Sequence, residues 1–156
     1  MSHRWAALVL VLALCAMSPR HAAGQTSSTP LGHKLSGKLK QNYPNPFNPE
    51  TTIPFSVEGC LDGSEQGTVS VRILNILGQL VAIPVFAGTD AASTVSVSSS
   101  LLKQKMSNLR LPCGSFKSFW DGNNQANGKE AASGIYVYQL FVDGKPAETH
   151  KMAVVK

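Results

Sequence analysis

The sequence predicts an all-β domain, a sandwich of about seven antiparallel strands with one short inserted helix. Two observations predict it: short apolar segments alternate with period two, and clusters of glycine, asparagine and proline separate these segments as turns. No helical crossovers lie between the segments, which disfavours a parallel sheet. The 156 residues, 43% hydrophobic and 15% charged, are enough for one such domain.

Residues 1–24 are predicted to be a secretory signal peptide. His3 and Arg4 give a short basic start, an apolar run covers residues 5–17, and small residues precede the expected cleavage after Gly24. The apolar run is shorter than the roughly 20 residues that a membrane-spanning helix needs, so we expect no stable membrane span. Removal of these residues leaves 12 basic and 9 acidic side chains, a net charge of +3. This mild charge gives no indication of a nucleic-acid partner.

Residues 25–39 are polar and small without an apolar period, which predicts a flexible tether before a folded domain of residues 40–156. The following segment, residues 41–49, contains three prolines and cannot form a helix or a central strand. We expect its two aromatic residues, Tyr43 and Phe47, to pack down onto one end of the core as a lid.

The strands are expected in the following order. Ile53, Phe55 and Val57 alternate inward, and Pro54 predicts that their strand lies at an edge or bulge. Further strands are predicted at residues 69–73, 80–85, 94–98 and 116–120, and the last hairpin pairs 135–142 with 147–155 around an Asp-Gly turn. With one tryptophan near the middle of the fold, this arrangement is typical of an immunoglobulin-like β-sandwich. The final strand is the best candidate for an exposed edge that pairs with another chain.

The inserted helix is predicted between Ser98 and Leu109. Serines there can cap a helix, and Leu102, Met106 and Leu109 have helical spacing. Such a helix would cover one end of the sandwich or bind a partner.

Two cysteines, Cys60 and Cys113, remain after the predicted signal peptide is removed. In an oxidising compartment such a pair can form a disulfide, and it can equally remain as two separate thiols. The sequence leaves both readings open.

Catalytic and metal-binding patterns are weak. Beyond residue 24 the only histidines are His33 and His150, and no established catalytic or nucleotide-binding motif is present, which predicts a protein that is not an enzyme and has no cofactor. Asp121, Asn123 and Asn127 are weak calcium candidates in a loop whose register does not fit an EF-hand. Turn formation explains these loop residues without an ion.

Five segments, from residue 39 to the end, carry a resemblance to a known family. They are LKQNYPNPFNPETTIPFSV, VSVRILNILGQLV, FWDG, ASGIYVYQLFVDG and the closing KMAVVK. In this order they resemble the C-terminal sorting domain of the type IX secretion system (the Por secretion system, type A). That family overlaps with the immunoglobulin-like domain of the flagellar hook-capping protein.

The resemblance implies removal of the signal peptide by signal peptidase, folding in the periplasm and export to the cell surface or medium. It implies recognition by the outer-membrane translocon and cutting by a sortase-like peptidase, expected between His33 and Lys40. The recognition candidates lie at the family's motif positions, and they are Gly78, Gly134, Lys151, Met152, Val154, Val155 and Lys156. The oligomeric state is not implied.

The chain departs from the family in two ways. The interval from Gly78 to Trp120 spans 42 positions, longer than in the family, which indicates an insertion at about residues 86–113. Only 16 residues, Gln25–Lys40, lie between the signal peptide and the domain, with no room for a cargo core. The alternative reading is therefore a stand-alone structural or adhesive domain of the hook-cap type that interacts with other surface or extracellular proteins.

Overall fold

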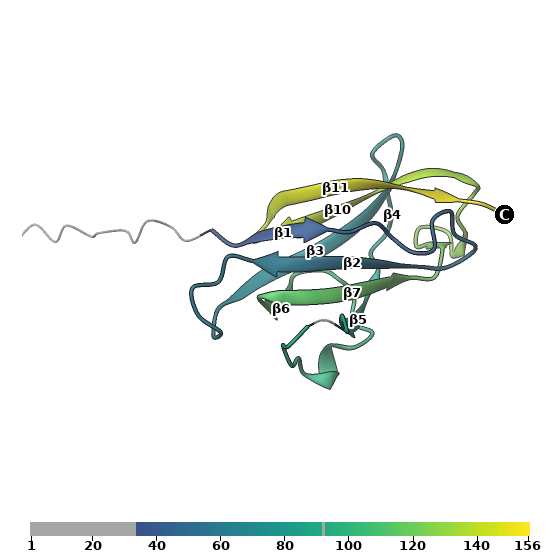
Figure 1. Ribbon diagram of the computed structural model, residues 1–156. Helices are drawn as coiled ribbons and strands as arrows, with labels where there is room; N and C mark the ends of the chain where they lie inside the picture. Colours follow the sequence, from purple (N-terminus) through teal and green to yellow (C-terminus); the bar gives the residue numbers. More distant parts are fainter. Residues whose placement is uncertain (1–33, 92) are drawn as a thin grey trace, which may run out of the picture.

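A computed structural model describes residues 34–91 and 93–156. The predicted signal peptide and residues 25–33 of the predicted tether lie outside the described residues. The described chain is all-β with antiparallel sheets, in an arrangement consistent with a β-sandwich, and the all-β prediction is confirmed (Figure 1).

The first sheet has four strands in the order β1-β2-β7-β5. Their bounds are β1 (Ser36–Leu39), β2 (Thr51–Glu58), β7 (Gly114–Trp120) and β5 (Val85–Thr89). The predicted alternation holds in β2, where Ile53, Phe55 and Val57 are all buried. These alternate side chains turn one face of this sheet toward the core, and Pro54 between them is buried as well.

The second sheet has five strands, in the order β11-β10-β3-β4, with β6 paired to the start of β3. Their bounds are β11 (Lys145–Val154), β10 (Gly134–Val142), β3 (Gln66–Asn75), β4 (Leu80–Ala82) and β6 (Leu109–Pro112). A small ribbon joins β8 (Asn123–Asn124) to β9 (Lys129–Glu130). The described residues thus form eleven strands rather than the predicted seven or so, because several are short pieces separated by breaks.

The core consists of inward side chains from both sheets. β3 contributes Val69, Val71 and Ile73, and β10 contributes Tyr138 and Leu140, all of them fully buried. Trp120 lies at one end of this core, with its ring 5.4 Å from that of Phe47 and 5.8 Å from that of Tyr136. The long-range pairing of segments distant in sequence makes this a fold of non-local contacts.

The edge position predicted from Pro54 is wrong. β2 lies between β1 and β7, and the Pro54 carbonyl accepts a hydrogen bond from the Lys40 amide at 2.9 Å. Because proline has no N–H, the return hydrogen bond to the Lys40 carbonyl cannot form. The Tyr138 hydroxyl donates to that carbonyl instead, at 2.9 Å, so a side chain supplies the donor that the proline lacks.

The predicted helix between Ser98 and Leu109 is wrong as well. Only Ser99–Leu101 is helical, as a single 3-10 turn capped by Ser98. Lys103 has a φ of 65°, which ends the turn, and its amide donates to the Phe86 carbonyl on the edge of β5. The segment with helical apolar spacing therefore forms hydrogen bonds with the edge of β5. The Met106 side chain is buried although no helix forms. Residues 94–98, predicted as a strand, are extended but unpaired among the described residues.

The predicted tether contains a strand. Ser36–Leu39 forms β1, which pairs with β2 over four residues, and Leu39 is buried. The alternation of exposed and buried residues in this short segment is a strand pattern that its polar composition conceals. Of the two aromatic residues predicted as a lid, Phe47 is buried, whereas Tyr43 is 51% exposed.

A disulfide joins Cys60 to Cys113, with 5.9 Å between their Cα atoms. Cys60 follows β2, and Cys113 lies between β6 of the second sheet and β7 of the first. Because the end of β2 pairs with the start of β7, the bond closes this end of the first sheet, where the chain crosses from β6 to β7.

Candidate functional site

Recognition candidates from three segments of the sequence meet at one end of the five-stranded sheet. Tyr136 of β10 pairs with Asn75 of β3 on one side and with Met152 of β11 on the other. Gly134 pairs with Val154, and the turn that contains Gly78 directly follows Asn75. We call this part of the molecule the recognition end: residues 75–80, 134–136 and 151–156.

The turn from β3 to β4 is built around the Asn75 side chain. Its Oδ1 atom accepts hydrogen bonds from the amides of Leu77 at 3.0 Å and Gln79 at 2.9 Å, while the Gly78 amide donates to the Asn75 carbonyl at 3.0 Å. Gly78 has a φ of 77°, in the left-handed region that glycine adopts without strain, and open space surrounds it. The asparagine and the glycine thus fix the turn, and the residues between them point outward.

The recognition candidates in the last strand divide into two groups. Met152 and Val154 are buried, so in the folded domain they serve the core and are not accessible to a partner. Lys151, Val155 and Lys156 are exposed, and Lys156 forms an ion pair with Glu130 at 3.2 Å. Among these candidates the accessible ones are therefore Lys151 in β11 and Val155 and Lys156 just after it.

The outer edge of β11 is partly covered by the proline-rich segment. The Phe47 amide donates to the Ala153 carbonyl, the Val155 amide donates to the Phe47 carbonyl, and the Ala153 amide donates to Asn45 Oδ1, each at 3.0 Å. Residues 45–47, which we call the clasp, thereby cover the backbone at the end of β11. Covering an edge in this way blocks its pairing with another chain, so strand addition at this end requires removal of the clasp.

An exposed apolar patch, which the sequence analysis missed, surrounds the Gly78 turn. The side chains of Ile76 and Leu77 are 75% and 78% exposed, and those of Leu80 and Ile135 are 50% and 49% exposed. Leu74 pairs with Leu80 on one side and with Val137 on the other. The apolar patch is defined as Leu74, Ile76, Leu77, Leu80, Ile135 and Val137.

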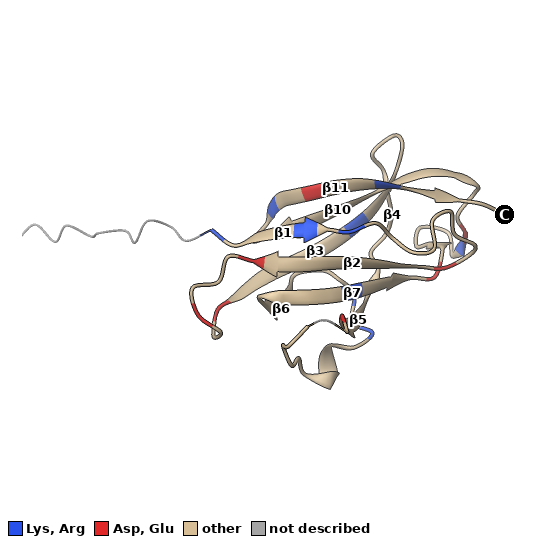
Figure 2. Cartoon of the chain, in the orientation of Figure 1, with Lys and Arg blue, Asp and Glu red and all other residues tan. Residues whose placement is uncertain are grey.

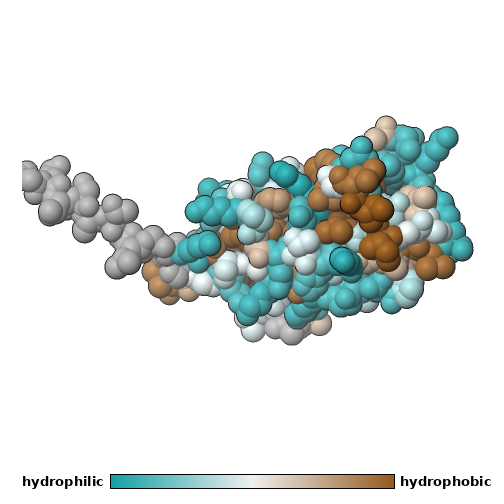
Figure 3. Space-filling model, turned by 90° about the horizontal axis from the view of Figure 1, so that it is seen from above, coloured by the Kyte–Doolittle hydropathy of each residue, from teal (hydrophilic) through white to brown (hydrophobic). Residues whose placement is uncertain are grey.

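The pictures agree with this assignment. Figure 3, which looks down on the side that carries the turn, shows apolar side chains gathered at the end of the molecule away from the N-terminal trace. Figure 2 shows no charged residue in the turn between β3 and β4. The sequence signal was two adjacent large apolar residues, Ile76 and Leu77, inside a turn where polar residues are usual.

A buried polar network supports the proline-rich segment. Besides donating to Lys40, the Tyr138 hydroxyl accepts a hydrogen bond from the Asn42 amide at 3.1 Å. Burial raises the pKa of Tyr138, and the charge of Glu148 acts in the same direction. His150 lies against this tyrosine, with 5.7 Å between the ring centroids, and its Nε2 is 3.8 Å from a Glu148 oxygen.

The weak calcium candidates use their oxygens within the loop. The carboxylate of Asp121 accepts from the Asn123 amide at 3.0 Å and from the Asn123 side chain at 2.9 Å, and Asn127 Oδ1 accepts from the Lys129 amide at 3.0 Å. These are turn-forming bonds. Across the described ranges, no group of three or more His, Cys, Asp or Glu side chains is arranged to hold a metal ion.

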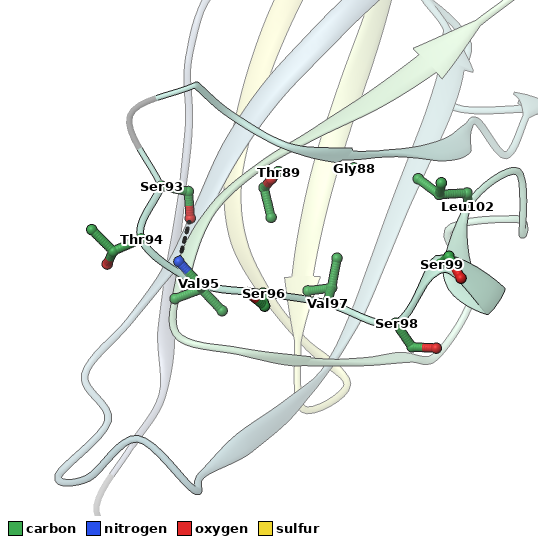
Figure 4. A pocket seen from close by; sticks show the side chains of 10 residues that line it. All are labelled: Gly88, Thr89, Ser93, Thr94, Val95, Ser96, Val97, Ser98, Ser99 and Leu102. Atoms are coloured by element: carbon green, nitrogen blue, oxygen red, sulfur yellow. Dashed lines mark hydrogen bonds between the residues drawn. The ribbon is translucent and has the colours of Figure 1, made fainter.

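A cavity of about 460 Å³ lies between β5 and the inserted segment (Figure 4). Gly88 and Thr89 lie on one side, and the extended residues 94–98 lie on the other. Serine and threonine hydroxyls alternate around it with the side chains of Val95, Val97 and Leu102, and none of its lining residues is charged. The cavity therefore has no base that could activate a nucleophile.

Comparisons with known proteins give little. No family model matches the chain, and no curated protein matches it. A solved structure, the Pseudomonas fluorescens alkylpurine DNA glycosylase AlkC bound to DNA containing an abasic site analog, matches with a TM-score of 0.44 and 11% identity. The match covers 78% of this chain and 31% of that one, so the chain spans about a third of the matched protein.

This match bears on one prediction. The sequence predicts that the protein is not an enzyme, whereas the matched structure is that of an enzyme, so the prediction is corrected and is not carried further. The similarity is too low to transfer any activity to this chain.

None of the helical structure within residues 34–91 and 93–156 has the length and hydropathy of a membrane span.

Proposed function

We propose that the protein is a secreted protein whose C-terminal immunoglobulin-like domain is recognised by the type IX secretion machinery. The proposed route runs from the periplasm through the outer-membrane translocon to the cell surface or the medium. Its proposed partners are signal peptidase, the translocon and a sortase-like peptidase.

One observation carries this proposal above all others. The Gly78 turn lies 56 residues before Gly134 in the sequence, and Gly134 and the end of β11 are the two ends of one hairpin. The pairing of β10 with β3 brings all three to one end of a single sheet. A contiguous, exposed surface built from the family's motif positions is what a translocon that reads a folded domain requires.

The test is the export of a reporter protein that carries residues 25–156 at its C-terminus, in a host with type IX machinery. Deletion of Val155 and Lys156 removes exposed recognition residues and leaves the buried Met152 and Val154 in place. We expect the deletion to leave the reporter in the periplasm. The substitution Leu61→Ser is a control at another exposed apolar residue, because Leu61 lies in the loop before β3, at the opposite end of that strand.

Circular dichroism and thermal unfolding of the same variants show whether the fold is retained. Surface export of the folded variant without Val155 and Lys156, at the level of the wild type, would sink the proposal.

A second candidate is a stand-alone structural or adhesive domain of the hook-cap type. It is favoured by the core: large buried apolar side chains of the described residues, from Leu39 to Val154, pack into one cluster. Under this candidate, export of the reporter would not depend on the last two residues.

A further inference from the structure

We propose that the apolar patch is a lipid-binding surface, which inserts the Gly78 turn into the interface of a bilayer with anionic headgroups. This inference goes beyond the proposed export function and does not depend on it. Its starting point is exposure: Ile76 and Leu77 have three quarters of their side-chain surface in water, at the tip of a hairpin that protrudes from the sheet (Figure 1). Single exposed apolar residues are ordinary, but here four exposed aliphatic side chains lie on one surface with the half-buried Leu74 and Val137, and such a continuous group usually marks a binding surface.

Four backbone amides of the turn are paired within the turn itself, which lowers the cost of moving it into a bilayer interface. Burial of an unpaired N–H group in hydrocarbon costs several kcal/mol, which normally keeps turns out of a bilayer. Here the amides of Asn75, Leu77, Gly78 and Gln79 all donate to acceptors within the turn itself. The Asn75 side chain also donates to Gln79 Oε1 at 2.8 Å, so the polar groups at the base of the turn satisfy one another.

The charges around the patch favour an anionic bilayer. Residues 75–80 contain no charged side chain. Lys151 pairs with Val137 across β10 and β11, which places it on the same face as the patch, and it forms no ion pair with any described residue. The nearby acidic residue of β11, Glu148, is engaged on the other face, where its carboxylate accepts from the Leu39 amide.

The composition of the patch favours lipid over a protein partner. All six side chains are aliphatic, and the binding energy of protein interfaces is concentrated in tryptophan, tyrosine and arginine. A protruding tip of leucine and isoleucine with a lysine at its margin matches the pattern of an interfacial anchor, whose affinity combines buried apolar area with attraction to anionic headgroups.

The experiment is co-sedimentation of residues 25–156, which contain every described element, with vesicles of phosphatidylcholine and phosphatidylglycerol in a two-to-one ratio. We expect the double variant Ile76→Ser, Leu77→Ser to lower the partition coefficient by about tenfold or more, since each loses the transfer of a large aliphatic side chain. The control Leu61→Ser should bind as the wild type does. Lys151→Glu should weaken binding to these vesicles and leave the residual binding to pure phosphatidylcholine unchanged.

Three results would overturn the proposal. The first is no binding of the wild type to the mixed vesicles, and the second is an equal loss in Leu61→Ser and the double variant. The third is a concentration-dependent dimer in analytical ultracentrifugation that the double variant abolishes, because the patch would then be an interface between two copies. The export proposal is tested separately, by the deletion of Val155 and Lys156, so either can fail without the other.

Discussion

A single hydroxyl group compensates for the proline in the middle of the first sheet. Pro54 lies inside a strand with neighbours on both sides, a position that proline normally cannot occupy because it lacks the ladder donor. The Tyr138 hydroxyl, which comes from the opposite sheet, donates to the Lys40 carbonyl that Pro54 leaves unpaired, and accepts from the Asn42 amide. The tyrosine therefore connects the two sheets through the one gap in the ladder between β1 and β2.

We predict that Tyr138→Phe lowers the free energy of unfolding by about 2 kcal/mol, because a buried amide and a carbonyl each lose a partner. The measurement is urea denaturation near neutral pH. A loss below the error of the measurement would mean that solvent replaces the hydroxyl and that the network contributes little.

The same tyrosine predicts a pH dependence. Its pKa is raised above 10.0 in the folded state, mainly by burial, so the unfolded chain loses this proton at lower pH than the folded chain does. The stability that this group contributes is complete below pH 10 and is lost as the pH rises toward the folded pKa. The difference in stability between the wild type and Tyr138→Phe should therefore shrink above pH 10, as urea midpoints measured across that range would show. A constant difference would contradict this explanation.

The aromatic pair of the proline-rich segment provides a matched comparison. Phe47→Ala empties a fully buried site against Trp120, and we predict a loss of about 3–5 kcal/mol. Tyr43→Ala changes a half-exposed side chain four residues away and should cost less than about 1 kcal/mol. Chemical denaturation followed by tryptophan fluorescence measures both. Equal losses would show that the clasp does not depend on the burial of Phe47.

At the level of elements, the proline-rich segment packs closely against the loop that begins with the WDG sequence, Trp120 to Gly122. Gly122, with a φ of 77°, lies so close to the Pro49 carbonyl that an added Cβ would approach its oxygen to 1.9 Å. The Trp120 indole donates to the Asn123 carbonyl at 3.0 Å and holds the loop beneath the clasp. The glycine of this motif is therefore required by a close approach between two backbones.

The elements also show what could be predicted from the sequence. Period-two alternation located β2, β3, β7, β10 and β11, because a strand with one buried face has apolar residues at alternate positions of its sequence. Alternation missed β1, whose four residues include only one large apolar side chain. Helical spacing wrongly predicted a helix where Met106 and Leu109 reach the core from an irregular segment and a strand. Long-range pairing decided both cases, and local spacing carries no record of it.

The same limit applies to the candidate site. The motifs around Gly78, Gly134 and the last strand were found in the sequence, but their convergence follows from sheet register, which the sequence did not specify. The sequence also did not show which recognition candidates of the last strand are buried. In the structure Met152 and Val154 face the core, while Lys151 between His150 and Met152 is exposed. The apolar patch was missed because Ile76 and Leu77 were assigned only to a turn.

The disulfide gives a prediction at the same scale. It closes a loop with a sequence separation of 53 residues, for which the chain-entropy model gives about 4 kcal/mol of stabilisation. The double variant Cys60→Ala, Cys113→Ala should lose approximately this amount in denaturation experiments, and added reductant should then have no further effect on it. A variant as stable as the oxidised wild type would contradict a stabilising role for the bond.

For the whole molecule, the position of β1 limits where the chain can be processed. Cutting was expected between His33 and Lys40, but Ser36–Leu39 is paired with β2 and Leu39 is buried. A peptidase needs an extended, accessible backbone, so we predict that any processing of the folded domain occurs before Ser36. N-terminal sequencing of the processed species tests this, and a cut within residues 36–39 would mean that β1 leaves the sheet during export.

The central claim is that this domain directs export across the outer membrane. The most direct measurement is the intact mass and amount of the protein in periplasm, outer membrane and medium, compared between a host with type IX machinery and the same host without it. We predict that the protein lies in the outer membrane or medium of the first host, whether whole, cut before Ser36 or joined to a surface glycolipid, and accumulates in the periplasm of the second. The same distribution in both hosts would contradict the account.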